Sequence, residues 1–140
     1  MILLDTNIIS EVMLLQPNRN VRQWLDKQII ETLFLSSVSI AEITFGIEIL
    51  PEGKKRERLT QEFENFVLPY FGDRILNFDK NSARAFAVLT ARTRKKGLAI
   101  GMADAYIGAI AYSNKLTVAT RDTSPFEAMG LKVINPFIFS

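Results

Sequence analysis

Short apolar segments alternate along this chain with stretches of helical periodicity. The apolar segments are expected strands at residues 1–5, 33–37, 74–78, 116–120 and 132–134. Their nearly continuous apolar character is typical of strands buried on both faces. Helical stretches between successive strands favour parallel pairing, because parallel strands need a crossover connection. The sequence therefore predicts an α/β fold with three layers, α/β/α, around a short parallel sheet of about five strands.

Several local signals set the ends of the expected helices. The helices are expected up to about residue 15 and over residues 21–29, 39–50, 54–67, 79–96 and 103–114. Ser39 and Glu42 match a capping box, Asp79 is an expected N-cap, and Gly97 is an expected stop. The helix over 54–67 has an expected apolar face of Leu59, Phe63, Phe66 and Val67.

The composition excludes several kinds of catalytic site. The chain has 140 residues, the size of one domain, and residues 1–140 are expected to form it. It has no Cys and no His, which excludes disulfides, thiolate or imidazole metal ligands and Ser-His-Asp triads. Any catalysis would rest on carboxylates, hydroxyls or basic side chains. A net charge of +2 permits a nucleic-acid partner without requiring one.

No segment is typical of a signal peptide or a membrane span. The N-terminus lacks a basic region followed by a long apolar run. The longest weakly charged run, residues 97–114, contains Asp104 and several polar residues and is an expected buried helix. We therefore expect a cytoplasmic protein that does not enter a membrane.

Four acidic residues fall where sites form in parallel sheets. Asp5 ends the first expected strand and Asp122 follows the fourth. Glu42 and Asp104 fall in the first turns of two expected helices. Sites in such sheets lie beyond the carboxyl ends of the strands, so all four are expected at one edge. Each of them alone could also serve only as a helix cap or as a favourable charge at a helix N-terminus.

The surroundings of Asp104 point to a cation. It is the only charged residue between Lys96 and Lys115. Burial of a carboxylate costs several kcal/mol without a partner, whereas a helix N-terminus returns only about 0.3–1 kcal/mol. Two carboxylates about 4 Å apart repel by roughly 4 kcal/mol at an effective dielectric of about 20. With all-oxygen ligands, Mg²⁺ or Mn²⁺ is the expected ion, and such ions support phosphodiester hydrolysis.

Three neighbours of these acids are candidate supporting residues. The hydroxyls of Thr6 and Thr120 could bond a carboxylate or a phosphate, although local bonds to the backbone are common for Thr. Asn7 could bond a carboxylate or the substrate, or merely cap the first helix.

Two basic clusters and one further arginine are candidate RNA contacts. The clusters are Lys54, Lys55, Arg56 and Arg58 at the start of one helix, and Arg92, Arg94, Lys95 and Lys96 at the end of another. Each could simply be a solvated face, or it could contact a phosphate backbone. Arg121 lies beside the predicted site and could contact a phosphate or pair with an acid.

Four short motifs, taken in order, resemble those of PIN domains. They are LLDTNIIS at 3–10, AEI at 41–43 with Gly46, ADA at 103–105 with Ile107 and Ala109, and TRD at 120–122 with Phe126. Within these domains the chain is similar to VapC-type toxins of bacterial toxin–antitoxin pairs. The FitB-like subgroup is the nearest, on the MILLDTN opening, Gly53-Lys54-Lys55, VATRDT at 118–123 and Asn135-Pro136.

The resemblance implies a metal-dependent ribonuclease with Mg²⁺ or Mn²⁺ held by Asp5, Glu42, Asp104 and Asp122, and with Thr120 at the hydroxyl position beside them. It also implies cleavage of RNA, commonly tRNA or ribosomal RNA. Many relatives have Asn at the position of Asp122 and an Asp-Phe pair a few residues later. Here that pair is Pro125-Phe126, so Asp122 is the expected fourth acid.

Partners follow from the same resemblance. VapC-type toxins form homodimers, and a small antitoxin wraps them, often places an arginine in the acidic pocket, and binds promoter DNA. The apolar stretches 43–50 and 59–67 are candidate dimer surfaces, with core packing as the simpler role.

The resulting function hypothesis is an endoribonuclease toxin. The main alternative is a weakly catalytic or non-catalytic partner whose acidic pocket binds an antitoxin and regulates promoter DNA binding. A phosphatase with an Asp nucleophile would want an acid where Asn7 stands. A phosphoacceptor domain could use Asp79 and Lys132 but would leave Glu42 and Asp104 unexplained.

Overall fold

Residues 1–138, which the computed structural model describes, form a parallel sheet with the strand order β3-β2-β1-β4-β5. The strands are β1 (Ile2–Leu4), β2 (Leu33–Ser36), β3 (Ile75–Leu76), β4 (Thr117–Ala119) and β5 (Val133–Ile134). The first strand is central, and it pairs in parallel with both β2 and β4. The predicted parallel α/β sheet is confirmed.

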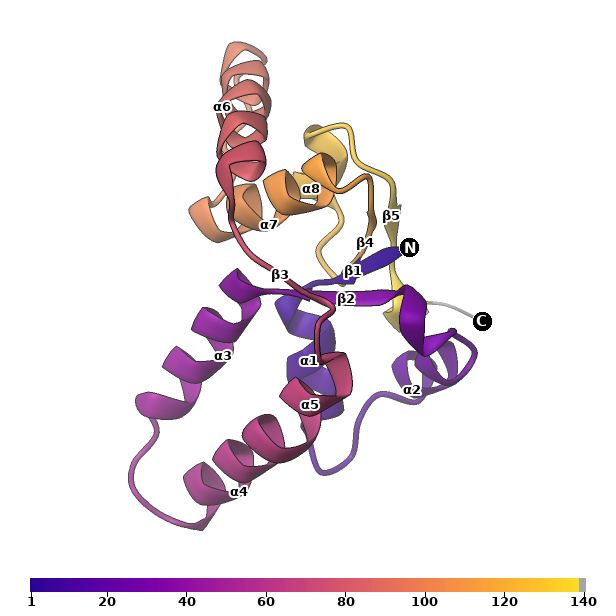
Figure 1. Ribbon diagram of the computed structural model, residues 1–140, viewed down its shortest axis with the longest axis vertical. Coiled ribbons are helices and arrows are strands. Elements are labelled where there is room, and N and C mark those ends of the chain that lie inside the picture. Colours follow the sequence, from indigo (N-terminus) through magenta and orange to yellow (C-terminus); the bar gives the residue numbers. More distant parts are fainter. Residues whose placement is uncertain (139–140) are drawn as a thin grey trace.

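Helices cover both faces of the sheet, and α1–α5 lie on one side while α6–α8 lie on the other (Figure 1). They are α1 (Thr6–Val12), α2 (Arg19–Asp26), α3 (Ser37–Glu48), α4 (Lys54–Glu62), α5 (Leu68–Phe71), α6 (Lys80–Lys95), α7 (Met102–Ser113) and α8 (Ser124–Ala128). Shorter turns are η1 (Ile30–Thr32), the π-helical turn η2 (Phe63–Val67) and η3 (Pro136–Ile138). This arrangement confirms the three layers. Among the helices of residues 1–138, none has the length and apolar character needed to cross a membrane.

The central strand supplies one leucine to each of two hydrophobic cores. Successive side chains of a strand point to opposite faces, so Leu4 packs with the core beneath α1–α5 and Leu3 with the core beneath α6–α8. Trp24 belongs to the first core and Ile107 to the second. Full burial of a Leu side chain stabilises a fold by about 1.5–3 kcal/mol. Burial on both faces explains why β1 is apolar at consecutive positions.

The start of α3 differs from the prediction. Ser39 was the expected cap, but the Oγ of Ser36 accepts the hydrogen bond from the backbone N–H of Ser39 at 3.1 Å, and the helix begins at Ser37. Glu42 therefore lies in the second turn, so the predicted capping box is wrong. The helix also ends at Glu48, before the expected Leu50. These changes leave Ser39 as a fully buried helical residue.

A π-helical turn interrupts the helix expected over residues 54–67. The backbone N–H of Leu68 bonds the carbonyl oxygen of Phe63, five residues earlier. This wider turn changes the angle between successive side chains. Phe63 is 1% exposed, whereas Phe66 is 71% exposed, so the prediction that both belong to one apolar face is wrong for Phe66. Leu59 and Val67 do pack against the core.

Other helix ends agree in part with the sequence signals. Asp79 caps α6 as predicted, because its Oδ1 accepts from the N–H of Ser82 at 2.8 Å. Gly97 has a φ of +73° just past the helix, as expected of a stop. The helix expected over 21–29 ends at Asp26, which leaves Ile29 exposed. The short α8 was not predicted.

Candidate active site

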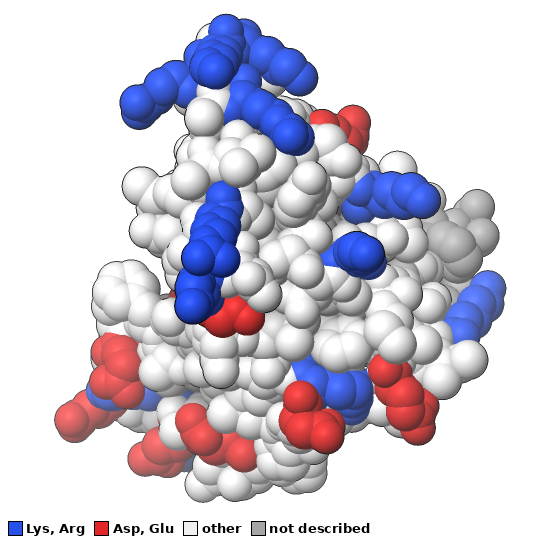
Figure 2. Space-filling view, turned by 45° about the horizontal axis from the view of Figure 1, so that its top comes forward, with Lys and Arg blue, Asp and Glu red and all other residues white. Residues whose placement is uncertain are grey.

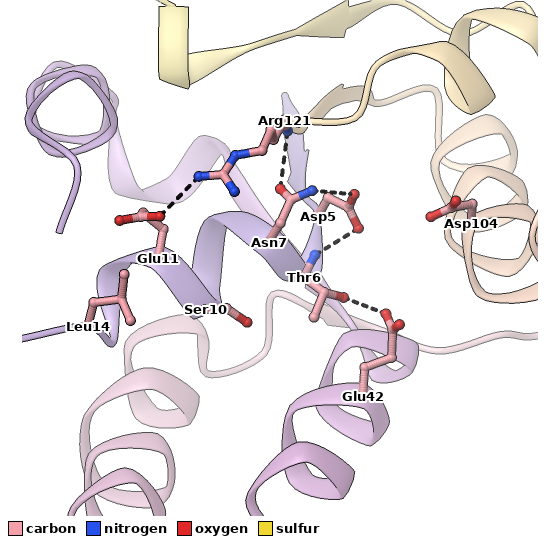
Figure 3. A pocket seen from close by; sticks show the side chains of 9 residues that line it. All are labelled: Asp5, Thr6, Asn7, Ser10, Glu11, Leu14, Glu42, Asp104 and Arg121. Carbon is pink, nitrogen blue, oxygen red and sulfur yellow. Dashed lines mark hydrogen bonds and ion pairs between the residues drawn. The ribbon is translucent and has the colours of Figure 1, made fainter.

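An open pocket of about 390 Å³ lies at the carboxyl edge of β1 (Figure 3). It is lined by Asp5, Thr6, Asn7, Ser10, Glu11, Leu14, Glu42, Asp104 and Arg121. Three of the four acids singled out in the sequence therefore face one pocket. They come from segments far apart in the chain: Asp5 follows β1, Glu42 lies on α3, and Asp104 lies in the first turn of α7.

Asp5 is the most deeply placed of these acids, at 4% exposure. Its Oδ1 caps α1 by accepting from the N–H of Thr6 at 2.8 Å, and its Oδ2 accepts from the hydroxyl of Thr120 at 2.8 Å. Burial raises the pKa of the Asp5 carboxyl to about 6, although these hydrogen bonds act in the opposite direction. The charges of Asp104 and Glu42 add to the rise. Asp5 therefore combines the capping role with a place in the pocket.

Thr120 and Asn7 tie the end of β4 to the end of β1. The Thr120 hydroxyl donates to Asp5 and accepts from the N–H of Asp122 at 3.0 Å and from the amide of Asn7 at 3.2 Å. The Oδ1 of Asn7 in turn accepts from the N–H of Arg121 at 3.2 Å. Both residues thus bond the carboxylate of Asp5 as well as each other.

Glu42 ends a chain of hydroxyl groups. The Oγ1 of Thr6 donates to Oε1 of Glu42 at 2.6 Å, which uses its only proton. The Oγ of Ser39, 2.7 Å from Thr6 Oγ1, must therefore act as the donor in that bond. Ser36 donates to Ser39 at 3.4 Å. Ser39 is a supporting residue that the sequence motifs did not indicate, although its place three residues before Glu42 on the same helix was the available signal.

Asp104 forms the opposite wall of the pocket, on α7 (Figure 3). Its side chain is half-buried rather than fully buried as expected. Desolvation raises the pKa of the Asp104 carboxyl, and the charges of Asp122 and Glu42 raise it further. Asp122 is exposed and is not among the lining residues, but this repulsion means that it lies near Asp104. It does not cap α8, whose N-cap is Thr123.

The carboxylates around the pocket are oxygen donors of the type that a hard cation prefers, although among the described residues they do not stand as a formed metal site. Within residues 1–138, no three acidic side chains converge into a ready-made metal-binding group. In the same part of the chain no lysine or arginine forms an ion pair with Asp5, Glu42, Asp104 or Asp122. The raised pKa values reflect desolvated carboxyls that repel one another, and a divalent cation would favour their ionised forms. Asp5, Glu42 and Asp104 could hold Mg²⁺ or Mn²⁺, with Asp122 nearby.

The two basic clusters lie outside the acidic pocket. On α4, Arg56 pairs with Glu48 at 2.9 Å and Arg58 pairs with Glu62 at 3.1 Å, while Lys54 is exposed. Lys55 is also exposed. The cluster that ends α6 consists of the exposed residues Arg92, Arg94, Lys95 and Lys96. Figure 2 shows basic side chains gathered where α6 ends, at the top of the view, well apart from most of the acidic ones.

Arg121 is the one predicted basic residue that lines the pocket. Its guanidinium pairs with Glu11 at 3.3 Å and with none of the four acids. The sequence leaves two roles open for Arg121, contact with a phosphate or pairing with an acid. The structure shows pairing with an acid, which is Glu11 and not one of the four predicted site residues.

Comparison with known proteins places this chain in a family. Residues 2–131 match the family model described as PIN domain. The chain is 51% identical to the plasmid stability protein StbB of Pseudomonas syringae pv. tomato over 98% of its length and 99% of the relative. It is 48% identical to the VapC ribonuclease Y4jK of Sinorhizobium fredii over 98% of both chains. It is 44% identical to the toxin FitB of Neisseria gonorrhoeae over 98% of this chain and 99% of that protein.

Solved structures of similar sequence lead to the same family. A crystal structure of FitAcB from Neisseria gonorrhoeae is similar at a TM-score of 0.94 and 44% identity, covering 99% of this chain and 100% of that one. A structure of FitAB bound to an IR36 DNA fragment has a TM-score of 0.94 and 43% identity, covering 100% of this chain and 98% of that one. These likenesses run from end to end and include the segments that carry the four acids. The chain accordingly belongs to the PIN domain family, alongside VapC ribonucleases and the toxin FitB.

Proposed function

We propose that this chain is an endoribonuclease and the toxin of a toxin–antitoxin pair, which hydrolyses phosphodiester bonds of RNA with the help of Mg²⁺ or Mn²⁺. One observation carries the proposal: Asp5, Glu42 and Asp104, from three separate segments, line one open pocket, and no lysine or arginine among the described residues forms an ion pair with any of the three. The names of the relatives, a VapC ribonuclease and the toxin FitB, support the same reaction and role.

Each acid has a distinct part in this proposal. Asp5 and Asp104 would hold the principal ion, and Glu42 and Asp122 would complete its surroundings, partly through water. When bound, the divalent cation supplies positive charge that stabilises the phosphodiester transition state. Thr6 already occupies Oε1 of Glu42, so Oε2 is the atom that can take up the proton of an attacking water.

The supporting residues fix the acids in place. Thr120 and Asn7 hold Oδ2 of Asp5, and Thr6 holds Oε1 of Glu42. Fixed ligand positions matter because loss of such outer contacts commonly lowers metal affinity or activity by about 10–100-fold. Thr6, Asn7 and Thr120 are therefore proposed as positioning residues.

The basic clusters are proposed contacts to the RNA backbone. The end of α6 offers four exposed cations (Arg92, Arg94, Lys95 and Lys96), without ion pairs in residues 1–138. Lys54 and Lys55 on α4 are similarly exposed. Arg56 is a weaker candidate because Glu48 already pairs with it. Neutralisation of phosphates by such residues would supply sequence-independent affinity for an RNA such as tRNA.

The proposed protein partners are a second copy of this chain and a cognate antitoxin, with promoter DNA bound by the assembly. The relatives FitAcB and FitAB, the latter bound to a DNA fragment, support this assembly. Within the two stretches expected as dimer surfaces, Phe45, Ile49 and Phe66 are exposed and remain available for a partner. Their neighbours Ile43, Ile47 and Phe63 are buried in the core and are not.

A metal titration run beside a nuclease assay tests the function against its main alternative, a binding pocket without catalysis. Titration of Mn²⁺ into the wild-type chain and into Asp104→Asn is expected to show binding that the substitution weakens. RNA cleavage should follow metal occupancy. Metal binding without cleavage of any RNA tested would favour the alternative, in which the acidic pocket only receives a basic side chain of an antitoxin.

A further inference from the structure

The acidic pocket has a cationic end. Arg121 is the one basic residue among those that line it. Figure 3 shows its guanidinium extending toward Glu11, on the side of Asp5 away from Asp104. The pocket therefore has Asp5, Glu42 and Asp104 at one end and, at the other, a guanidinium that is paired with a fourth acid, Glu11. An acidic pocket alone would repel the phosphates of an RNA strand on both sides of the bond to be cut.

Glu11 holds the guanidinium from one side. Its side chain is only 12% exposed, and its two carboxylate oxygens have separate partners. Oε2 accepts from the N–H of Asn18 at 2.9 Å, and Oε1 accepts from Nη2 of Arg121 at 3.3 Å. Glu11 is thus anchored on its own, and its bond to Arg121 is the longer of the two. Such a bond can be exchanged for one to a stronger partner without loss of the anchor.

Phe137 holds the guanidinium from the other side. The Cζ of Arg121 lies 3.9 Å from the centroid of the Phe137 ring, a cation–π contact. The backbone that carries this ring is held at both of its polar atoms, because the N–H of Phe137 donates to Asn135 at 3.0 Å and its carbonyl oxygen accepts from Asn20 at 2.8 Å. Phe137 therefore helps to set the position of the Arg121 guanidinium.

Most of the hydrogen-bonding capacity of Arg121 is unused. A guanidinium has five N–H donors. Within residues 1–138 that group makes one hydrogen bond, to Glu11, and its side chain is 60% exposed. The fork of an arginine matches two oxygens of a phosphate, which a lysine cannot do equally well. The remaining donors of this exposed guanidinium are therefore open to a phosphate.

We propose that Arg121 binds a phosphate of the RNA strand that flanks the phosphate cleaved at the carboxylates, and that Glu11 and Phe137 are its positioning residues. The inference rests on the proposed ribonuclease function and identifies how the strand is oriented across the same pocket. The backbone N–H of Arg121 bonds Asn7 irrespective of the side chain, so a substitution at position 121 keeps that link to Asp5.

Binding of a single-stranded RNA oligonucleotide in EDTA, measured over a series of salt concentrations, tests this contact without cleavage. Arg121→Ala is expected to weaken binding about tenfold and to reduce the slope of log K against log salt by about 0.7, the value for one phosphate contact to a single strand. Arg121→Lys should keep the slope but recover only part of the affinity. Arg22→Ala, which removes an exposed arginine of α2 outside the pocket, is the matched control.

The positioning role of Phe137 has its own readout in the cleavage reaction. Phe137→Leu keeps the charge of Arg121 but removes the aromatic ring that holds its guanidinium, so KM should rise about threefold with kcat nearly unchanged. Arg121→Ala should raise KM about tenfold, again with a small effect on kcat. Thermal unfolding of each variant with the midpoint of the wild-type chain would exclude loss of the fold as the cause.

The outcomes separate this inference from the proposed function. If the wild-type chain cleaves RNA and Arg121→Ala matches Arg22→Ala in affinity, salt slope and KM, the phosphate contact is wrong and the nuclease stands. If Arg121→Ala changes the salt slope but no RNA is cleaved, the contact stands and the nuclease is wrong. If the wild-type chain neither binds RNA in EDTA nor cleaves it with Mg²⁺ or Mn²⁺, both are wrong.

Discussion

Thr6 and Glu42 are joined by a hydrogen bond of 2.6 Å between the threonine hydroxyl and Oε1 of the carboxylate. This bond links the first residue of α1 to the second turn of α3, across 36 positions of the sequence. The backbone N–H of the same threonine bonds Asp5. Thr6 therefore fixes one oxygen of each of two acids, and its place directly after β1 makes this possible.

Loss of that hydroxyl should lower cleavage while leaving the fold intact. Thr6→Val removes the donor to Glu42 and strands the donor hydroxyl of Ser39, so kcat/KM should fall about 10–100-fold. Thr6→Ser keeps the hydroxyl and should retain most activity. Thr44→Val, which alters an exposed threonine on the same helix α3, should match the wild-type chain. Equal rates for Thr6→Val and Thr44→Val would contradict the positioning role.

The buried Asp5 carboxyl should make the metal-free chain less stable as the pH rises. Burial raises its pKa in the folded chain from 3.8 to about 6. Between these values the folded chain holds the proton and the unfolded chain has lost it, so stability is full below about pH 4 and is lost as the pH rises through 6. At about 1.36 kcal/mol per pKa unit, the loss reaches roughly 3 kcal/mol above pH 6. Urea unfolding in EDTA at a series of pH values measures it.

Asp5→Asn provides the control for this pH dependence. Asn keeps an oxygen that can cap α1 but has no proton to lose, so most of the decline in stability between pH 4 and pH 6 should disappear. Mn²⁺ should stabilise the wild-type chain at pH 7.5 more than at pH 5, because the cation favours the ionised carboxyls. An unchanged slope in Asp5→Asn would show that another group causes the decline.

The basic end of α6 should contribute to RNA affinity in proportion to its charge. Simultaneous replacement of Arg92, Arg94, Lys95 and Lys96 by Ala should weaken binding of tRNA and reduce its salt dependence. Lys80→Ala with Arg84→Ala, near the start of the same helix, is the control, since both residues are exposed and lie outside the cluster. Fluorescence anisotropy over a salt series distinguishes the two sets. The same loss per removed charge in both sets would reduce the effect to net charge alone.

Two phenylalanines three residues apart should behave oppositely in a stability measurement. Phe63→Ala removes a side chain that is 1% exposed and should destabilise the chain by about 3–5 kcal/mol. Phe66→Ala changes one that is 71% exposed and should lie within about 0.5 kcal/mol of the wild-type chain. Equilibrium denaturation of both variants checks this. Similar losses for the two would contradict the π-helical turn between α4 and α5.

Phe63 and Phe66 also show what a hydrophobic pattern in the sequence cannot predict. Hydrophobic periodicity assumes a regular helix, and a single wider turn moves Phe66 from the predicted core face to the surface. The prediction of Ser39 as the N-cap of α3 was wrong for a different reason. Residues 36, 37 and 39 are all serines, and local sequence cannot choose among them. Pairing of Ser36 with Leu76 in the sheet extends β2 to that residue and so makes Ser36 the cap.

The predictions that depended on topology agree well with the structure. Apolar runs and crossovers predicted the parallel sheet, and the sheet edge then brought Asp5, Glu42 and Asp104 to one pocket. Contacts between side chains that are remote in sequence could not be predicted. The pair of Glu11 with Arg121 joins positions 110 apart, and no local pattern indicates it. Ser39 was noticed only as a cap because its bond to Thr6 also depends on the packing of two helices.

Cleavage of total tRNA by the purified chain, free of any antitoxin, tests the central claim most directly. Wild-type, Asp104→Asn and Asp73→Asn chains would each be incubated with Mg²⁺, Mn²⁺ or EDTA, and Asp73, exposed and outside the pocket, serves as the control. Cleavage is expected from the wild-type and Asp73→Asn chains with metal, and from no chain in EDTA. Asp104→Asn should lose at least about 100-fold in rate. Cleavage that persists in EDTA, or at an unchanged rate in Asp104→Asn, would contradict a metal-dependent nuclease built on these acids.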